Sequence, residues 1–508
     1  MLLLEPISVD IGMNKGKSSP LPKKKTISQI DLMTYMAGLI YVKTRFLPTK
    51  IHSVPLGLAQ ISSILKEKGV HASHEPFILD ALYRSLTDRE IEQRIRSHDY
   101  DHVLLSVGSQ VAADETIRYA RIVKRINNDT PIIVGGVYPT FYPEWFMEHL
   151  EVDMVIRGPA EDAMRQYVSQ HNTSSKNIPG LCYRNGNNIH ISPEYALVPD
   201  QETLPPMDLE GMNIDAYMKD NPFANLSTSR GCPFGCPFCL HAAYWSCKVQ
   251  FRKIENVQLE MKTFQDHGCK AGYIVDAIFT LNMKHVQKFV DAYAREKISI
   301  KLAFETRADS FNKATADLCS HFHPPLVWFG GESGSPRILS NLPGKQADGG
   351  KKHLDDMRAA VQNARQAGIM SGSSWVVGLP GETMETVKET ESFILELLRS
   401  GMDLADVRYL QVFPGTEYYN HAKDWGIQLE NGGIQPGKGD WRETISHRTF
   451  AMTADEIKRS AIDLQQTILQ YQKNTPVYPR VIRTLKLAEF MSRHKMLARA
   501  LIKMANKA

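Results

Sequence analysis

The sequence predicts an α/β protein built from an open parallel sheet, a partial (β/α)6 barrel and a small helical C-terminal region. In the first third and again in the middle, short apolar runs alternate with helical segments, which is the pattern of parallel strands with crossover helices. The chain has 508 residues, 43% of them apolar, a size that suits two to four domains. We expect four parts, at residues 1–168, 169–221 (a linker), 222–422 (the barrel) and 423–508.

The first part contains one clear helix, one helix start and several candidate strands. Gly57–Lys68 is amphipathic, with four aliphatic residues on one face, and Gly69 ends it. Thr87 and Glu90 have the capping-box spacing that begins a helix. The candidate strands are Leu2–Leu4, Phe77–Leu79, Val103–Val107, Ile132–Gly136 and Val152–Gly158.

Two loops of this part are candidates for ligand contact, because ligands bind open parallel sheets at the carboxyl ends of the strands. Taken alone, the glycine pair in the second loop is better explained as a tight turn. The candidate residues are Ser106, Gly108 and Ser109 in one loop, and Gly135, Gly136, Tyr138 and Thr140 in the other.

Six strand–helix units follow Pro222, the number that forms a partial barrel. In such barrels, the residues that carry the chemistry lie at the carboxyl ends of the strands. The strands are expected to end near Gly231, Asp276, Asp309, Gly331, Gly378 and Phe413. The helices between them include Glu255–Asp266, Met283–Arg295, Asp355–Ala367 and Thr383–Arg399.

Three cysteines on the loop after the first barrel strand carry the strongest chemical signal. Cys232, Cys236 and Cys239 have C-x3-C-x2-C spacing on a loop rich in glycine and proline. Such a loop can hold three irons of a four-iron cluster and leave the fourth iron open to a small molecule. Structural zinc is the alternative, with His241 or Cys247 as the fourth ligand, although the sequence lacks the second cysteine pair that is usual at zinc sites.

The cysteine loop resembles the signature of the radical SAM enzymes, including the aromatic Phe238 before the last cysteine. The resemblance implies a TIM-like partial barrel that holds a [4Fe-4S] cluster on the three cysteines. It also implies that S-adenosylmethionine (SAM) binds the open iron and is cleaved to a 5′-deoxyadenosyl radical.

The first part is similar to the cobalamin-binding domain of the B12-dependent radical SAM family. Pro55–Leu58, Asp80, Ser106, Gly135–Thr140 and Ile156–Gly158 occur in that family's order ahead of the barrel. The resemblance implies a Rossmann-like domain that binds cobalamin through the two loops named above. The D-x-H-x-x-G motif that supplies an axial histidine in other cobalamin proteins is absent. The chain therefore resembles members that hold cobalamin without a histidine, and a vestigial domain without the cofactor is the alternative.

The same resemblance assigns SAM contacts at the ends of several barrel strands. Glu332 could alternatively cap a helix start, and Arg307 could pair with Glu305 or Asp276 instead of the SAM carboxylate. The implied SAM contacts are Gly330, Gly331, Glu332 and Ser333 after the fourth strand, with Phe238, Arg307, Ser374 and Val412.

Composition limits the partners and the compartment. The formal net charge of +4 is too small to indicate nucleic acid as a partner. Seven cysteines, most of them scattered, and an oxygen-sensitive cluster indicate the reducing cytoplasm. No signal peptide or membrane-spanning stretch is expected. The last thirty residues form a basic amphipathic pattern that is typical of a solvated helix face, with peripheral membrane contact as the alternative.

The leading hypothesis is a cobalamin-dependent radical SAM enzyme that methylates an unactivated carbon of a small molecule. A flavodoxin or ferredoxin is the expected electron donor. The architecture also resembles oxidising or ring-closing enzymes such as the anaerobic porphyrin-ester cyclase, and the shared motifs do not separate the two. A non-catalytic cobalamin- or zinc-binding protein is the third reading.

Overall fold

The computed structural model describes residues 36–42, 54–74, 87–96, 100–108, 112–170, 177–220, 222–434 and 445–473. The chain divides into two compact units, one including residues 54–199 and 205–220 and the other including 200–204 and 221–473. Outside the described residues lie the expected strands Leu2–Leu4 and Phe77–Leu79, the candidate ligand Ser109 and the basic C-terminal helix.

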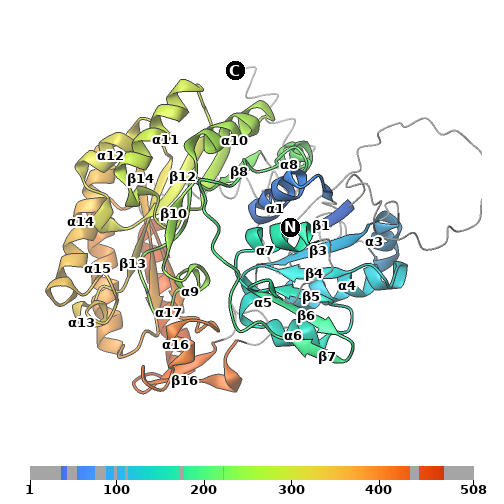
Figure 1. The fold of residues 1–508 in the computed structure, drawn as a ribbon. Coiled ribbons are helices and arrows are strands. Elements are labelled where there is room, and N and C mark those ends of the chain that lie inside the picture. Colours follow the sequence, from blue (N-terminus) through green and yellow to red (C-terminus); the bar gives the residue numbers. More distant parts are fainter. Residues whose placement is uncertain are drawn as a thin grey trace, which may run out of the picture. The chain divides into compact units, whose positions relative to one another are not determined.

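The first unit is built on a seven-stranded sheet with the order β2-β1-β3-β4-β5-β6-β7 (Figure 1). The strands from β2 to β5 run parallel, and β6 and β7 add an antiparallel edge. This is the expected open α/β architecture. The strands are β1 (Met36–Val42), β2 (His71–His74), β3 (His102–Val107), β4 (Ile132–Gly135), β5 (Met154–Ile156), β6 (Leu181–Asn185) and β7 (Asn188–His190).

Helices connect the parallel strands, and α1 packs on α7 while α3 packs on α4. The aliphatic face of α1 is buried as its pattern predicts. The predicted capping box is confirmed, since Thr87 N donates to Glu90 Oε2 at 2.7 Å and Glu90 N donates to Thr87 Oγ1 at 3.4 Å. The helices are α1 (Leu56–Glu67), α3 (Asp88–Ile95), α4 (Ala113–Ile126), α5 (Val137–Phe141), α6 (Pro143–Glu148), α7 (Glu161–Ser169) and α8 (Ile214–Asp220).

Two segments of the first unit differ from expectation. The apolar stretch that ends at Val42 was not assigned to the sheet, yet it provides β1, between β2 and β3. The segment 169–221 is more than a linker, because β6 and β7 pair onto the sheet edge and α8 follows. The sequence does not predict these strands because they lack an apolar pattern. β7, for example, lies at the sheet edge with all three side chains exposed.

The second unit contains six parallel strands in the order β15-β14-β13-β12-β11-β8. Strands that follow one another along the chain are therefore neighbours in this sheet. The expected six-unit barrel core is therefore present as an open sheet with β8 and β15 at its edges. The strands are β8 (Phe223–Leu226), β11 (Ala271–Ile274), β12 (Lys301–Thr306), β13 (Leu326–Glu332), β14 (Met370–Val377) and β15 (Leu404–Tyr409).

Helices surround this sheet on its outer side (Figure 1). The four predicted helices are present, although α14 begins earlier than expected, at Lys351. The helices are α9 (Leu240–Trp245), α10 (Ile254–Asp266), α11 (Met283–Arg295), α12 (Lys313–Ser320), α13 (Pro336–Leu339), α14 (Lys351–Gln366), α15 (Met384–Ser400) and α16 (Glu417–Asn420). Short 3-10 turns are η4 (Phe279–Leu281), η5 (Ala308–Ser310), η6 (Ala347–Gly350) and η7 (Glu430–Gly432).

The C-terminal region closes one edge of the second sheet. Helix α17 (Ala454–Lys473) packs on β14 and β15. Gln465 Oε1 accepts a hydrogen bond from Val407 N at 2.6 Å, which satisfies a backbone group of the edge strand. Two small hairpins complete the unit, β9 (Ser229–Gly231) with β10 (Val249–Phe251) and β16 (Ile427–Leu429) with β17 (His447–Thr449). Within the described ranges, no helix is long and apolar enough to cross a bilayer.

Candidate active site

The three-cysteine loop connects β9 to α9 at the carboxyl end of the first barrel strand. Cys239 N donates to Cys236 O at 2.9 Å, and Cys239 is the residue before the helix. All three thiols are partly exposed. Gly231 has a φ of +88°, and a Cβ there would lie 1.8 Å from Lys248 O, so only glycine allows the β9–β10 hairpin to close beneath the loop.

The donor set of this loop fits an iron–sulfur cluster. Burial raises the pKa of all three thiols, to about 12 for Cys236. Because burial disfavours the thiolates that ligate metal, the positive charge of bound irons is what would hold them ionised. In the described part of the chain, no three His, Cys, Asp or Glu side chains converge on one metal ion. A four-iron cluster sets a different requirement, since each cysteine binds a different iron.

The two residues considered as a fourth zinc ligand both lie beside the loop. His241 is mostly buried, which lowers its pKa, and its ring hydrogen-bonds with the backbone of Gly231. Cys247 is exposed, and its Sγ would lie 3.5 Å from a Cβ at Gly235.

A buried carboxylate anchors the chain that enters the loop. Asp276 is 2% exposed and accepts from Thr228 N at 2.7 Å, Thr228 Oγ1 at 2.5 Å and Ser229 Oγ at 2.8 Å. Burial raises the pKa of Asp276, and these hydrogen bonds oppose the rise. Asp276 therefore orients the backbone just ahead of Cys232 and does not pair with Arg307.

A second buried group supports the same segment. Arg252 and Glu260 form a two-pronged ion pair with N···O distances of 2.8 and 2.5 Å, and each is at most 3% exposed. Arg252 Nη1 also donates to Ser227 O at 2.7 Å, and Arg252 N donates to Thr228 O at 2.9 Å. No sequence motif marks this pair, because its members are eight residues apart and become partners only when the end of β10 packs on α10.

The Gly330-Gly331-Glu332 turn ends β13 in a tightly supported conformation. Glu332 has a φ of +63°, unusual for a residue with a side chain. The buried Lys345 Nζ lies 2.9 Å from both Glu332 Oε1 and Gly330 O, and His353 Nε2 donates to Gly331 O at 3.1 Å. Lys345 and His353 were missed from the sequence because no motif connects them to the turn.

The other predicted SAM residues occupy different environments. Ser333 is fully buried and its hydroxyl shares a hydrogen bond with Thr390, so its contact with SAM stays a prediction. Ser374 is partly exposed and accepts from Trp328 Nε1 at 2.7 Å. Val412 is fully buried, and the Phe238 ring lies 6.3 Å from that of Tyr418.

Arg307 has a partner that neither sequence alternative named. Its guanidinium pairs with Asp309, with an N···O distance of 2.6 Å, and donates to Gly344 O at 2.6 Å. It also lies 3.9 Å from the ring centroid of Phe234, inside the cysteine loop. Neither Glu305 nor Asp276 is its ion-pair partner, and its contact with the SAM carboxylate stays a prediction. Arg307 is placed beside the loop through a cation–π contact.

We expect Gly331→Ala to disturb this turn. The new Cβ would lie 2.7 Å from the ring of Trp375, which is fully buried and cannot move aside. Overpacking of this kind costs about 1–3 kcal/mol of the free energy of unfolding, and it should raise the dissociation constant for SAM by displacing Glu332. Thermal unfolding and equilibrium dialysis with SAM measure the two effects. Gly57→Ala, where a Cβ meets nothing within 4 Å, is the control and should show neither.

The turn after β14 contains a buried carboxyl that predicts a pH dependence. Burial raises the pKa of Glu382 to about 7 from 4.5. As pH rises, Glu382 loses its proton at a lower pH in the unfolded chain than in the folded protein. The free energy of unfolding should therefore fall by about 3 kcal/mol between about pH 4.5 and 7 and stay lower above that range. Glu382→Gln should remove this fall and be more stable than the wild type at pH 8. Urea unfolding at several pH values tests it. The exposed Glu385→Gln is the control, and a Glu382→Gln profile that matches the wild type would contradict the prediction.

In the first unit, the carboxyl ends of β3, β4 and β5 meet at a glycine-rich edge. A Cβ at Gly136 would lie 2.7 Å from Val107 O, and Gly136 has a φ of +112°. Thr140 Oγ1 donates to Gly136 O and accepts from Gly158 N, each at 2.8 Å, which ties the segment after β4 to the loop after β5. A Cβ at Gly135 would have one described neighbour, the Cβ of Ile156 at 4.0 Å. Loops with bare glycine backbone at the carboxyl ends of parallel strands fit the edge at which such sheets bind ligands.

The remaining candidates of this edge are less informative. Ser106 is partly exposed at the end of β3, and Gly108 is exposed. Tyr138 is buried, 3% exposed, in α5. Their contact with cobalamin stays a prediction.

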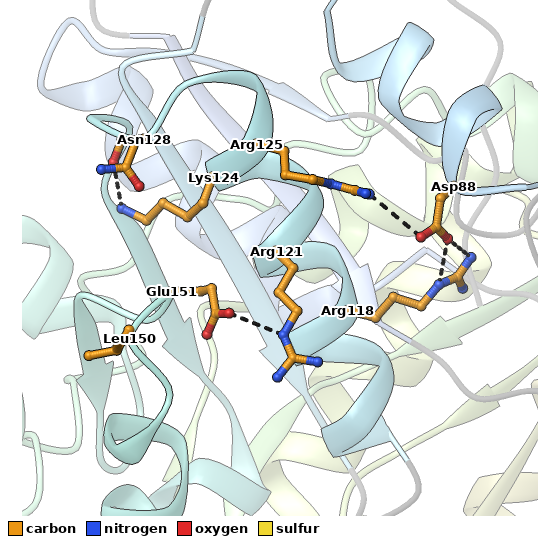
Figure 2. Close-up of a pocket in the computed structure, with 8 residues that line it drawn as sticks. All are labelled: Asp88, Arg118, Arg121, Lys124, Arg125, Asn128, Leu150 and Glu151. Carbon is orange, nitrogen blue, oxygen red and sulfur yellow. Dashed lines mark hydrogen bonds and ion pairs between the residues drawn. The ribbon is translucent and has the colours of Figure 1, made fainter.

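A hollow of about 600 Å³ on the first unit is lined by the cations of α4 (Figure 2). Every one of them is ion-paired: Arg118 with Asp88 and Glu115, Arg121 with Glu151, Lys124 with Asp153, and Arg125 with Asp88. Four cations meet four carboxylates, so the hollow has no excess positive charge for an anionic ligand.

Comparisons with known proteins agree with this arrangement. Residues 49–168 match the B12 binding domain, and residues 226–394 match the radical SAM superfamily. An uncharacterized methyltransferase (PH0819) of Pyrococcus horikoshii is 30% identical over 373 residues, 72% of this chain and 78% of the relative. The anaerobic magnesium-protoporphyrin IX monomethyl ester cyclase of Synechocystis is 24% identical over 78% of this chain and 77% of its own. The radical SAM methyltransferase TsrM of Kitasatospora setae, solved with cobalamin and a [4Fe-4S] cluster, has a TM-score of 0.69 at 16% identity, covering 86% and 91% of the two chains.

A three-cysteine loop at the first strand of an open six-stranded β/α sheet defines a radical SAM enzyme. The chain belongs to the radical SAM family whose members carry a cobalamin (B12)-binding domain. Its cofactors are those of the family: a [4Fe-4S] cluster, SAM and cobalamin.

Proposed function

We propose that the protein is a cobalamin-dependent methyltransferase that adds a methyl group to an unactivated carbon of a small molecule. The observation that carries the proposal is the C-x3-C-x2-C loop in one chain with a B12 binding domain. The methyltransferase relative, which shares 30% of its residues over most of both chains, supports methyl transfer over other radical reactions.

The residues of the chain have separate tasks in this proposal. When bound, the reduced cluster supplies the electron that cleaves SAM to a 5′-deoxyadenosyl radical, and methylcobalamin supplies the methyl group. Cys232, Cys236 and Cys239 hold the cluster, and Asp276 orients the segment ahead of them. Glu332, oriented by Lys345, is available for hydrogen bonds from SAM beside glycines that permit close backbone approach.

The cobalamin contacts are assigned to the glycine-rich edge of the first unit. Gly135 and Gly136 carry no side chain at this edge, Gly136 packs closely on Val107, and Thr140 ties this segment to the loop after β5. None of the three carries an imidazole, in keeping with the missing D-x-H-x-x-G motif. The chain thus resembles cobalamin proteins without a histidine ligand.

Oxidative ring closure is the second candidate function. The cyclase relative, 24% identical over about three quarters of each chain, favours it. The products separate the two functions: methyl transfer yields S-adenosylhomocysteine and a methylated product, whereas ring closure yields 5′-deoxyadenosine without S-adenosylhomocysteine.

The cobalt-to-protein ratio after anaerobic purification from cells supplied with cobalamin is the first test. A ratio near one supports methyl transfer. A ratio near zero with iron and sulfide present contradicts it and indicates a vestigial first domain. A flavodoxin or ferredoxin in the cytoplasm is the proposed electron donor, and stimulation of SAM cleavage by either reduced protein tests that part.

A further inference from the structure

One row of side chains lies on the inner face of the six-stranded sheet, the face opposite the surrounding helices. Burial alternates along β11 and β13, and in β12 Glu305 is an exposed position between the buried Phe304 and Thr306. The row runs across four neighbouring strands and consists of Tyr273, Glu305, Trp328 and Ser374. We call these four residues the inner row.

Register and hydrogen bonds bring the inner row together. Glu305 lies directly opposite Trp328 on the adjacent strand. Tyr273 Oη donates to Glu305 Oε1 at 2.8 Å, and Trp328 Nε1 donates to Ser374 Oγ at 2.7 Å. Neighbours in register on parallel strands point to the same face, so the carboxylate of Glu305 lies between two aromatic side chains.

Among the described residues, Glu305 is the carboxylate on the inner face that has no cationic side chain as its partner. The other carboxylates at this face have cationic partners: Glu332 pairs with Lys345, and Asp406 pairs with Arg408. The nearby Arg307 pairs with Asp309. Burial, and secondarily the charge of Glu332, raise the pKa of Glu305, although water still reaches its side chain. A carboxylate that has no cationic partner and lies between two aromatic side chains gains from a bound positive charge.

We propose that Glu305, Tyr273 and Trp328 bind an ammonium group of the substrate. The carboxylate attracts the cation and accepts its N–H hydrogen bonds, and both aromatic rings attract it through their π faces. This inference rests on the proposed function and deepens it, because it names the substrate class as an organic amine. SAM also carries an ammonium group, so the experiment must separate the two sources.

Isothermal titration calorimetry of the reconstituted holoenzyme tests the site, with and without saturating SAM. Phenethylamine and tetramethylammonium are the cationic probes, and N-acetylphenethylamine is the neutral counterpart. Both cations should bind, the neutral compound should not, and SAM should leave the affinity for the cations unchanged. Glu305→Gln should weaken phenethylamine binding by about tenfold or more, the size expected for a charge-assisted hydrogen bond. It should weaken tetramethylammonium binding less, because that cation has no N–H to donate. Tyr273→Phe should weaken phenethylamine binding less than Glu305→Gln does, since the carboxylate remains.

Asp317→Asn is the matched control, because it removes the same charge from the exposed face of α12 and should change nothing. The proposal is overturned if neither cation binds, if Glu305→Gln binds them as tightly as the wild type, or if N-acetylphenethylamine binds equally well. Competition by SAM would assign the site to SAM and overturn the substrate assignment. Reductive SAM cleavage in the same preparation is an independent check: cleavage without amine binding defeats this inference alone, whereas binding without cleavage defeats the proposed function.

Discussion

Replacing Cys236 with alanine is expected to abolish cluster assembly and SAM cleavage together. Each cysteine of the loop supplies one iron ligand, and the pKa of Cys236, raised by burial to about 12, indicates a thiol that ionises only with a metal beside it. Loss of even an outer-shell partner costs metal affinity by about 10–100-fold, so loss of a direct ligand should cost more. Iron and sulfide analysis, the visible absorption of the cluster and 5′-deoxyadenosine formation measure the effect.

Cys247→Ala is the control for this prediction and also decides between cluster and zinc. Cys247 lies beside the loop and is exposed, but it is outside the three-cysteine spacing. A cluster protein should keep its iron and its SAM cleavage in this variant. If instead both the Cys236 and the Cys247 variants lose zinc, and the wild type contains no iron, the loop is a structural zinc site and the proposed function is wrong.

Arg252→Met is expected to lower the free energy of unfolding of the second unit by about 3–5 kcal/mol, the usual cost of leaving a buried charge without its partner. Arg252 and Glu260 are both almost completely buried, and Arg252 also holds Ser227 O beneath the cysteine loop. The variant should therefore also retain less iron. Urea unfolding of the reconstituted protein and iron analysis measure the two effects.

Lys313→Met provides the comparison for an exposed ion pair. Lys313 and Asp317 lie on the surface of α12, with side chains 69% and 54% exposed. Surface pairs of this kind contribute about 0–1 kcal/mol, so this variant should unfold almost as the wild type does. Equal losses in the two variants would mean that the buried pair has no special role in supporting the loop.

The strongest predictions from the sequence were those that depend on neighbours in the chain. The cysteine spacing, the capping box at Thr87 and the amphipathic face of α1 are local patterns, and the structure places each on the expected element. The alternation of strands and helices also gave the order of the six barrel strands, because short β/α connections place successive strands side by side. Strands without an apolar pattern, such as β7, were not predicted from the sequence.

By itself, the sequence determined the class of the protein: a cobalamin-domain radical SAM enzyme with its cluster loop after the first barrel strand. Only the tertiary structure decided which distant side chains support that loop and the turn after β13. Asp276, Arg252 and Lys345 reach their partners across strands and helices that are separated in the sequence. A charged group inside a protein needs a partner, and the packing of the chain determines which residue lies close enough. Arg307 therefore pairs with Asp309 and not with Glu305 or Asp276.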